Sequence, residues 1–300
     1  MKRLSTIILA TRPWSFSMTA ISVTLGSILI LPEGGFRWEL YLPVLLGMIL
    51  VHAATNLAND YFDVKHGVDS QDSPTSRYRE HPLIEETLKP QHILYLSLVF
   101  YFTAGLIGLY LALVRGWIII VLACLGGFAS FFYTAGPIKY KHYALGELSV
   151  FFMWGPLMMA ASYFIQVGNW AFIFPVVLLS IPQGLWVALV LLGNNLKDIE
   201  YDRKIGLKTL GTIFGRRGTI GFYILMVSLI YLVTGLEILI GVIPVWGIVS
   251  FASLPLIVRL ILTFRREKEI PPDADPRTAQ AGMIYGLLLI ASFLISILVQ

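Results

Sequence analysis

Long apolar runs recur through the whole chain, and they constrain its fold more than any other feature of the sequence. Each is close to the roughly 20 residues that a helix needs to cross the hydrocarbon core of a bilayer. Of the 300 residues, 57% are hydrophobic and only 13% are charged, whereas soluble domains carry about 25% charged residues. The runs cover nine ranges: 14–32, 41–63, 92–114, 117–133, 145–166, 170–196, 219–240, 243–263 and 281–299.

This pattern predicts an all-α, polytopic protein of the cell membrane with nine transmembrane helices. We expect one membrane-embedded domain over residues 1–300, with the lipid bilayer as its solvent. No small-residue cleavage site follows the first apolar stretch, so we interpret it as a retained helix. Cys124 is the only cysteine and lies inside an apolar run. It therefore supports neither a disulfide framework nor a paired-cysteine metal site.

Lysine and arginine are confined almost entirely to alternate loops. Only Arg37 and Arg115 lie in the odd-numbered loops, while the N-terminal segment and the even-numbered loops hold nearly all the others. Because basic loops face the cytoplasm, we predict a cytoplasmic N-terminus and an external C-terminus. This placement explains the basic residues without a nucleic-acid partner, since no basic run carries interleaved aromatic residues that could stack on bases.

Two clusters of acids and amides stand at the ends of the second and sixth runs. Both runs are predicted to pass from outside to inside, so both clusters lie at the cytoplasmic edge. Charged side chains in or beside the membrane are costly, and they indicate a functional site by default. The first motif reads Asn56-Leu-Ala-Asn59-Asp60-Tyr-Phe-Asp63, and the second motif reads Asn194-Asn195-Leu-Lys-Asp198-Ile-Glu-Tyr-Asp202.

Helical spacing places most of these side chains on one face of each helix. Asp198 and Asp202, for example, are four residues apart and therefore neighbours. Glu200 points elsewhere and is expected to be solvated, while Asp69 lies in the loop beyond Gly67. The shared faces carry Asn56, Asp60 and Asp63, with Asn59 beside them, in the first motif, and Asn194, Asn195, Asp198 and Asp202 in the second.

Carboxylate and amide oxygens are the ligands that hard cations prefer. Mg²⁺ typically combines one or two carboxylates with water molecules and the oxygens of a substrate phosphate. Neither motif has a histidine or cysteine at the spacing of a zinc site. The motifs therefore predict a site for Mg²⁺ and a diphosphate. The alternative is that the acids only cap helix ends and pair with nearby basic residues.

A diphosphate also requires cations other than the metal. Arg77, Lys139 and Lys208 lie in three separate loops on the side of the acidic motifs, and we predict that they contact the phosphates. The remaining basic residues of these loops are interpreted as topology signals: Arg79, Lys141, Lys204, Arg216 and Arg217.

At these motifs the chain resembles the UbiA superfamily of intramembrane aromatic prenyltransferases, over nearly its whole length. The family's first motif matches Asn59-Asp60-Tyr-Phe-Asp63, with its last acid displaced to Asp69, and its second motif matches Asp198-Ile-Glu-Tyr-Asp202. The finer pattern resembles the 1,4-dihydroxy-2-naphthoate prenyltransferase branch of menaquinone biosynthesis. His81-Pro-Leu83 stands where the family often has Arg-Pro-Leu. The other matching stretches are Arg12-Pro13, 133–139, 145–147 and 194–210.

The resemblance implies a UbiA-like bundle with an active-site cavity on the cytoplasmic side. Two Mg²⁺ ions would clamp the diphosphate of an isoprenyl donor, and an electron-rich aromatic acceptor would attack C1 of the allylic cation in a cavity shielded from water. The implied metal ligands are Asp60, Asp63, Asp198, Asp202 and Asn56, and the implied substrate contacts are Asn59, Asn195, Arg12, Arg77, Lys139 and Lys208.

Several alternatives remain at this stage. The acceptor could be 1,4-dihydroxy-2-naphthoate, 4-hydroxybenzoate, another phenol or an archaeal glycerol-phosphate lipid. Two other classes of protein are a cation-coupled transporter and a non-catalytic quinone- or lipid-binding protein. A transporter would place its acids near the centres of its spans, whereas here they lie at one edge. The sequence does not assign the base that deprotonates the acceptor.

Overall fold

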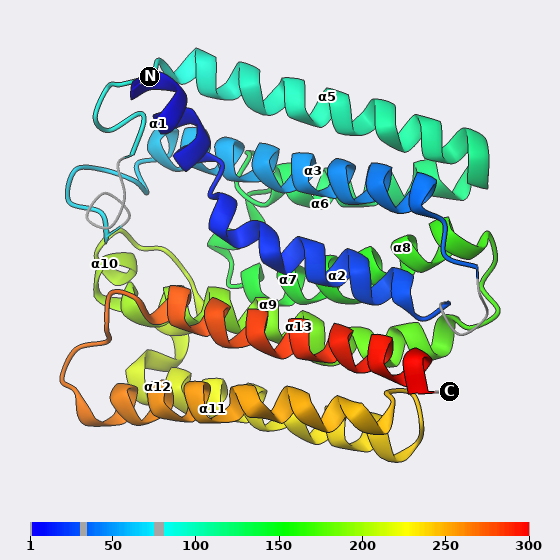
Figure 1. Cartoon of the computed structure of the whole chain (residues 1–300). Helices are drawn as coiled ribbons and strands as arrows, with labels where there is room; N and C mark the ends of the chain where they lie inside the picture. The colour runs from blue at the N-terminus through cyan, green and yellow to red at the C-terminus, as the bar shows by residue number, and fades with distance from the viewer. Residues whose placement is uncertain (1, 31–34, 75–80, 300) are drawn as a thin grey trace.

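Helices lying roughly antiparallel to one another form the protein, and the computed structural model describes residues 2–30, 35–74 and 81–299 (Figure 1). No strand occurs within these ranges, which confirms the all-α class. The first half contains α1 (Lys2–Ala10), α2 (Phe16–Ile28), α3 (Trp38–Lys65), α5 (Pro90–Arg115) and α6 (Ile118–Phe132). The second half contains α7 (Gly146–Phe152), α8 (Met158–Val167), α9 (Ile173–Lys197), α10 (Ile199–Lys204), α11 (Leu210–Leu239), α12 (Leu254–Arg266) and α13 (Ala274–Val299).

Seven helical runs of the described chain are long and apolar enough to cross a membrane. Each of the nine predicted ranges coincides with a helical run, but the ranges 14–32 and 117–133 correspond to the shorter helices α2 and α6, of 13 and 15 residues. Nine membrane crossings therefore remain a prediction. The seven runs are α3, α5, residues 146–167, α9, α11, residues 245–266 and α13.

The C-terminal ends of α3 and α9 lie at the same end of the bundle (Figure 1). Helices α3 and α9 both finish at the end that also holds α1, α10 and the N-terminus, while the C-terminus lies at the opposite end (Figure 1). The large exposed side chains include Leu113 and Leu239, which are 80% and 82% exposed, as expected for surfaces that face lipid. The fold thus brings the two motifs to one end by the parity of their helices.

The helix α7 and the π-helical turn that follows it pack closely against α9. The π turn Met153–Leu157 contains Pro156, which cannot donate the hydrogen bond of a regular helix. A Cβ on Gly155 would lie 2.7 Å from the carbonyl oxygen of Ser180 and 3.0 Å from the Cα of Gly184. Only glycine permits this approach of two helix backbones.

Candidate functional site

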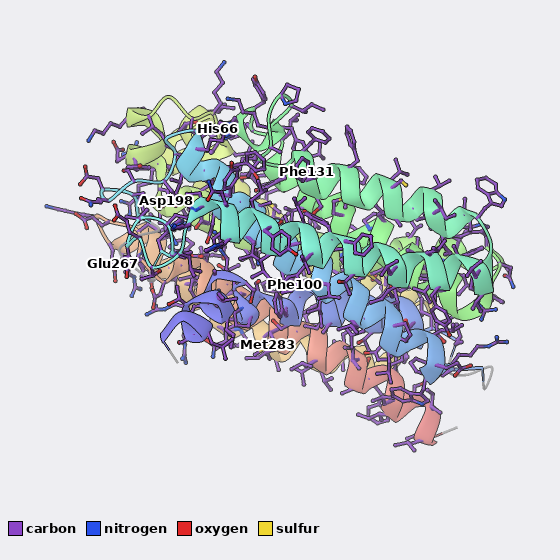
Figure 2. The ribbon with its side chains drawn as sticks, turned by 90° about the horizontal axis from the view of Figure 1, so that it is seen from above. His66, Phe100, Phe131, Asp198, Glu267 and Met283 are labelled. Atoms are coloured by element: carbon purple, nitrogen blue, oxygen red, sulfur yellow. The ribbon has the colours of Figure 1, made fainter. Side chains whose placement is uncertain are left out.

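The two acidic motifs line one cavity of about 1150 Å³. The first motif occupies the last turns of α3, and the second spans the junction of α9 and α10, where Asp198 ends one helix and begins the other. Figure 2 places Asp198 and His66, just beyond α3, toward the same end of the molecule. The cavity lining includes Asn56, Asn59, Asp63, Asn194, Asn195, Asp198 and Asp202, as well as Arg12, Asp69, Lys141 and Glu147.

Arg12 and Lys141 bring positive charge to the first motif. Arg12 Nη2 donates a hydrogen bond to Asp60 Oδ1 at 2.7 Å. Lys141 Nζ lies 2.5 Å from Asp63 Oδ2 and 3.1 Å from Asn59 Oδ1. Asn56 donates a hydrogen bond to the carbonyl oxygen of Thr11 at 2.9 Å, and this bond fixes the turn that carries Arg12 against α3. Two carboxylates of the first motif therefore each have a cation of the protein beside them.

The other basic residues of these loops lie outside the acid cluster that Arg12 and Lys141 enter, or outside the described residues. Lys139, predicted to contact phosphate, lies with His66 and His142 along a second, smaller pocket of about 230 Å³. Lys141, interpreted from the sequence as a topology signal, is the residue that enters the acid cluster. Lys208 is exposed and is not among the cavity-lining residues. Arg77 and Arg79 lie outside the described residues.

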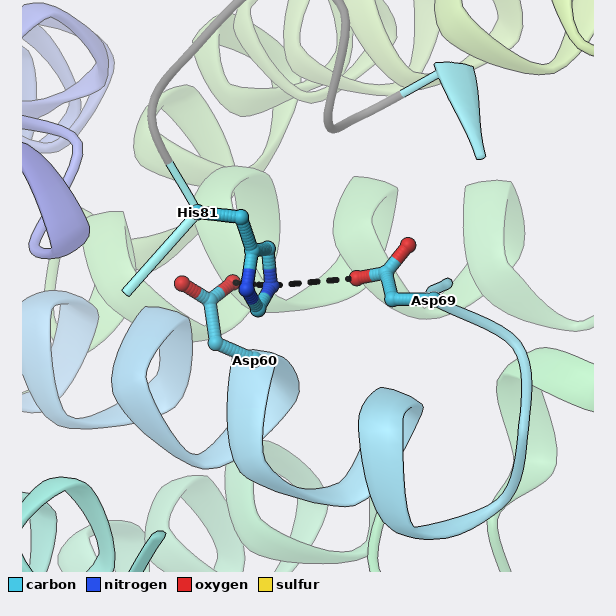
Figure 3. Close-up of side chains that lie close together, drawn as sticks. All are labelled: Asp60, Asp69 and His81. Atoms are coloured by element: carbon cyan, nitrogen blue, oxygen red, sulfur yellow. Dashed lines mark ion pairs between the residues drawn. The ribbon is translucent and has the colours of Figure 1, made fainter. Parts of the chain in front are cut away.

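Asp69 and His81 complete a buried cluster with Asp60 (Figure 3). Gly67 takes the left-handed φ of 72° that closes the end of α3, and the amide of Asp69 then donates to the carbonyl oxygen of Asp63 at 3.1 Å. This turn folds Asp69 back toward the helix. His81 Nε2 lies 3.5 Å from Asp69 Oδ2 and 3.9 Å from Asp60 Oδ1.

The hydrogen bonds of His81 assign its tautomer. Its Nδ1 accepts hydrogen bonds from the backbone amides of Leu83 and Ile84 at 3.3 and 3.4 Å, so the proton of the neutral ring lies on Nε2. Nε2–H therefore points toward the carboxylates of Asp69 and Asp60. Burial alone would raise the pKa of Asp69, but the nearby His81 and the charges of Lys141 and Arg12 hold that pKa below its ordinary value.

The second motif has few polar partners. Burial raises the pKa of Asp198 to about 7, with Lys197 opposing the shift and Asp202 reinforcing it. Burial also raises the pKa of Asp202 to about 6, even though Lys141 and a 3.3 Å hydrogen bond from Thr209 Oγ1 favour its ionised form. In both cases burial outweighs the groups that favour the ionised carboxylate.

The donor set fits a hard divalent cation. Asp63 Oδ1 and Asp198 Oδ1 are both buried and have no hydrogen-bond partner within residues 2–30, 35–74 and 81–299. Carboxylate oxygens that lack a donor are costly when buried, and a metal ion would relieve that cost at both motifs. This donor chemistry is compatible with Mg²⁺, and the Mg²⁺ site itself stays a prediction from the sequence.

The cavity continues from this polar end as an apolar channel between α3, α5, α6 and α8. Its lining includes Val44, which lies 19 residues before Asp63, so the channel follows α3 for about 28 Å at 1.5 Å per residue. A Cβ on Gly105 or Gly127 would meet no atom within 4 Å, so these glycines face open space. The site can accept a ligand with a multiply charged head and a long apolar tail.

Glu147 was not selected as a site residue by sequence reasoning. It is the second residue of α7 and lines the cavity beside the second motif. Asn195 Nδ2 donates a hydrogen bond to Glu147 Oε1 at 2.8 Å. The sequence signals are an acid just after Leu145-Gly and the resemblance of 145–147 to the family, and spacing alone does not link Glu147 to a residue on another helix.

Comparison with known proteins gives concordant results. The sequence model of the UbiA prenyltransferase family matches residues 20–283. The chain is 31% identical over 290 residues to 1,4-dihydroxy-2-naphthoate octaprenyltransferase of Bacillus subtilis, covering 95% of this chain and 91% of the relative. It is 30% identical over 303 residues to human UbiA prenyltransferase domain-containing protein 1, covering 98% and 85% of the two chains.

Solved structures share the fold at lower sequence identity. A UbiA homologue from Aeropyrum pernix superimposes with a TM-score of 0.70 at 15% identity, covering 93% of this chain and 97% of that one. A homologue from Archaeoglobus fulgidus, solved bound to GPP and Mg²⁺, gives a TM-score of 0.64 at 14% identity, covering 95% and 99%.

Proposed function

This chain belongs to the UbiA prenyltransferase family, and on that premise we propose that it catalyses the Mg²⁺-dependent transfer of an isoprenyl group from a polyprenyl diphosphate to 1,4-dihydroxy-2-naphthoate. The reaction would serve menaquinone biosynthesis. One observation carries the proposal: two acidic motifs and two cations meet at the end of a cavity that continues as a long apolar channel.

The acids of both motifs would hold two Mg²⁺ ions against the diphosphate of the donor. Bound Mg²⁺ would neutralise charge on the diphosphate and so stabilise it as a leaving group. The proposed ligands are Asp60, Asp63, Asp198 and Asp202, with Asn56 as a further oxygen ligand.

The protein's own cations and amides would bind the remaining phosphate oxygens. Arg12 and Lys141 already lie within hydrogen-bonding distance of the first motif, so a short movement of either side chain would bring it to a phosphate. Asn59 and Asn195 would bind phosphate from the two helices. Arg77, Lys139 and Lys208 remain proposed contributors to the positive field at this end.

The apolar channel would hold the isoprenoid tail and exclude water from C1 of the donor. Water would otherwise trap an allylic cation. We place this end of the bundle at the cytoplasmic face, because the basic loops lie there. The N-terminus would then be cytoplasmic and the C-terminus external.

The acceptor is inferred from the Bacillus subtilis relative, and three other acceptors remain in competition. The test is a panel assay with purified protein in lipid nanodiscs and one labelled prenyl diphosphate. We expect Mg²⁺-dependent prenylation of 1,4-dihydroxy-2-naphthoate and much slower transfer to 4-hydroxybenzoate, a simple phenol or an archaeal glycerol-phosphate lipid. Faster transfer to any of these three would overturn the acceptor, and transfer that persists with EDTA would overturn the metal requirement.

A further inference from the structure

Glu147 is a buried carboxyl group that the proposed metal site does not use. Its side chain belongs to a residue that is only 4% exposed, and one oxygen accepts the hydrogen bond from Asn195. The other oxygen, Oε2, is buried and has no hydrogen-bond partner in the described part of the chain. A buried carboxylate oxygen without a donor is costly. Glu147 lines the cavity, so a donor that enters the cavity can approach this carboxyl group.

Packing explains how this carboxyl is held in place. The close contact of Gly155 with Gly184 fixes α7 and its π turn against α9, and the bond from Asn195 then fixes the orientation of Glu147. A glutamine in this position could accept the same bond from Asn195 and donate from its other end. The free oxygen, rather than the contact with Asn195, is therefore what glutamate uniquely provides.

Tyr133 brings a second polar group to the same part of the cavity. Its hydroxyl lies 3.4 Å from the position that a Cβ on Gly146 would take, next to Glu147. Lys141 Nζ lies 5.9 Å from the centroid of the Tyr133 ring, so this ring lies near a cation of the acid cluster.

We propose that Glu147 and Tyr133 form the acceptor subsite, in which Glu147 Oε2 accepts a hydrogen bond from a hydroxyl group of the aromatic acceptor. This inference rests on the proposed function and deepens it. A carboxylate at this point favours a neutral hydroxyl and repels a carboxylate or phosphate. The acceptor's own carboxylate would therefore turn away from Glu147, and a glycerol-phosphate acceptor would be disfavoured.

The test compares acceptor and donor kinetics of Glu147→Gln in nanodiscs. We expect the KM for 1,4-dihydroxy-2-naphthoate to rise about tenfold to hundredfold, because a charge-assisted hydrogen bond is lost. The KM for the donor, and Mg²⁺-dependent donor binding without acceptor, should stay within about twofold of wild type. Glu147→Asp should restore part of the acceptor affinity. Glu200→Gln, at an acid whose side chain is 89% exposed, is the matched control and should behave as wild type.

A second measurement uses the wild-type protein and does not depend on the folding of a variant. Two acceptor analogues each lack one hydroxyl: 1-hydroxy-2-naphthoate and 4-hydroxy-2-naphthoate. The analogue that lacks the hydroxyl bound by Glu147 should bind about tenfold or more weakly than 1,4-dihydroxy-2-naphthoate. In Glu147→Gln that penalty should disappear for one of the two analogues. A Tyr133→Phe variant should raise the acceptor KM by about three- to tenfold.

The outcomes separate this inference from the proposed function. An unchanged acceptor KM in Glu147→Gln would overturn the inference while leaving the metal-dependent transfer intact. An equal loss of donor and acceptor affinity would also overturn it, since Glu147 would then act on the donor through Asn195. If both deoxy analogues bind wild type as well as the parent acceptor does, the acceptor hydroxyls make no such contact. Absence of Mg²⁺-dependent donor binding by wild type would instead reject the proposed function itself.

Discussion

The two acidic motifs have similar sequences, but the protein compensates their charges very differently. Arg12, Lys141 and His81 all approach acids of the first motif. Asp202 of the second motif has a hydrogen bond from Thr209, while Lys197 is engaged by Asp275 at 2.5 Å. The first motif is thus partly neutralised before a ligand arrives, whereas the second motif has fewer partners. We infer that the second motif provides most of the driving force for cation binding.

The largest effect is expected from removing one acid of either motif. Asp60→Ala and Asp198→Ala each delete a ligand of the proposed metal–diphosphate site, so turnover should fall about a hundredfold or more in both. Steady-state transfer by purified protein measures this, with Glu200→Gln as the control at an exposed acid. Turnover above about a tenth of wild type in either variant would show that its motif is dispensable.

The next effect separates the two lysines of one loop. Lys141→Gln should raise the donor KM about tenfold to hundredfold, because its ammonium group lies within the acid cluster. Lys139→Gln should change the KM less than about threefold, since Lys139 lies in the smaller pocket. This ranking reverses the one expected from the sequence. Equal losses at both positions would mean that the loop acts only through its general positive field.

A smaller effect should follow from changing His81. Because its Nε2–H faces Asp69 and Asp60, we predict that His81 positions these carboxylates and does not itself bind the metal. His81→Ala should weaken Mn²⁺ or Mg²⁺ binding about three- to tenfold, and His81→Gln, which keeps a donor, should recover part of the loss. Electron spin-echo spectra of bound Mn²⁺ should lack histidine nitrogen coupling. Finding that coupling would contradict the assigned tautomer.

An effect of similar size to that of His81 concerns pH and belongs to the second motif. The metal-free native state holds protons on Asp198 up to a pKa of about 7, whereas an unfolded chain releases them near the ordinary value for aspartate. As the pH falls from about 7 toward the ordinary pKa of aspartate, protonation of Asp198 stabilises the metal-free fold. The bound proton also competes with the metal for the carboxylate. When the pH is lowered from 7.5 to 6, protonation of Asp198 alone should weaken Mg²⁺ binding about eightfold. Calorimetric titration with Mg²⁺ at the two pH values measures this. The change in Mg²⁺ affinity between them should be smaller in Asp198→Asn than in wild type.

The helices and the convergence of the motifs follow from local features of the sequence. Apolar runs of sufficient length must form helices in a bilayer, and helices of the same parity end on the same side. That reasoning placed Asp63 and Asp198 at one end of the molecule, where the structure has them in one cavity. The short lengths of α2 and α6 were not foreseen, because hydropathy does not reveal where a helix ends.

The details of the site depend on backbone conformation and on packing between helices. The choice between Lys139 and Lys141 is decided by a loop in which Lys139 takes a left-handed φ of 32° and a 3₁₀ turn follows. Asp69 reaches Asp60 only because the chain turns at Gly67. Glu147 meets Asn195 across two helices that glycine lets approach. Sequence spacing specifies none of these relations between distant residues.

Binding of an unreactive donor tests most directly whether the two motifs act together on one Mg²⁺–diphosphate group. Calorimetry with a prenyl thiodiphosphate, run with and without Mg²⁺, should show binding by wild type only when Mg²⁺ is present. Asp60→Ala and Asp198→Ala should each lose that binding while remaining monodisperse in detergent. Wild-type affinity for the donor without Mg²⁺, or in either variant, would contradict a shared site built from both helices.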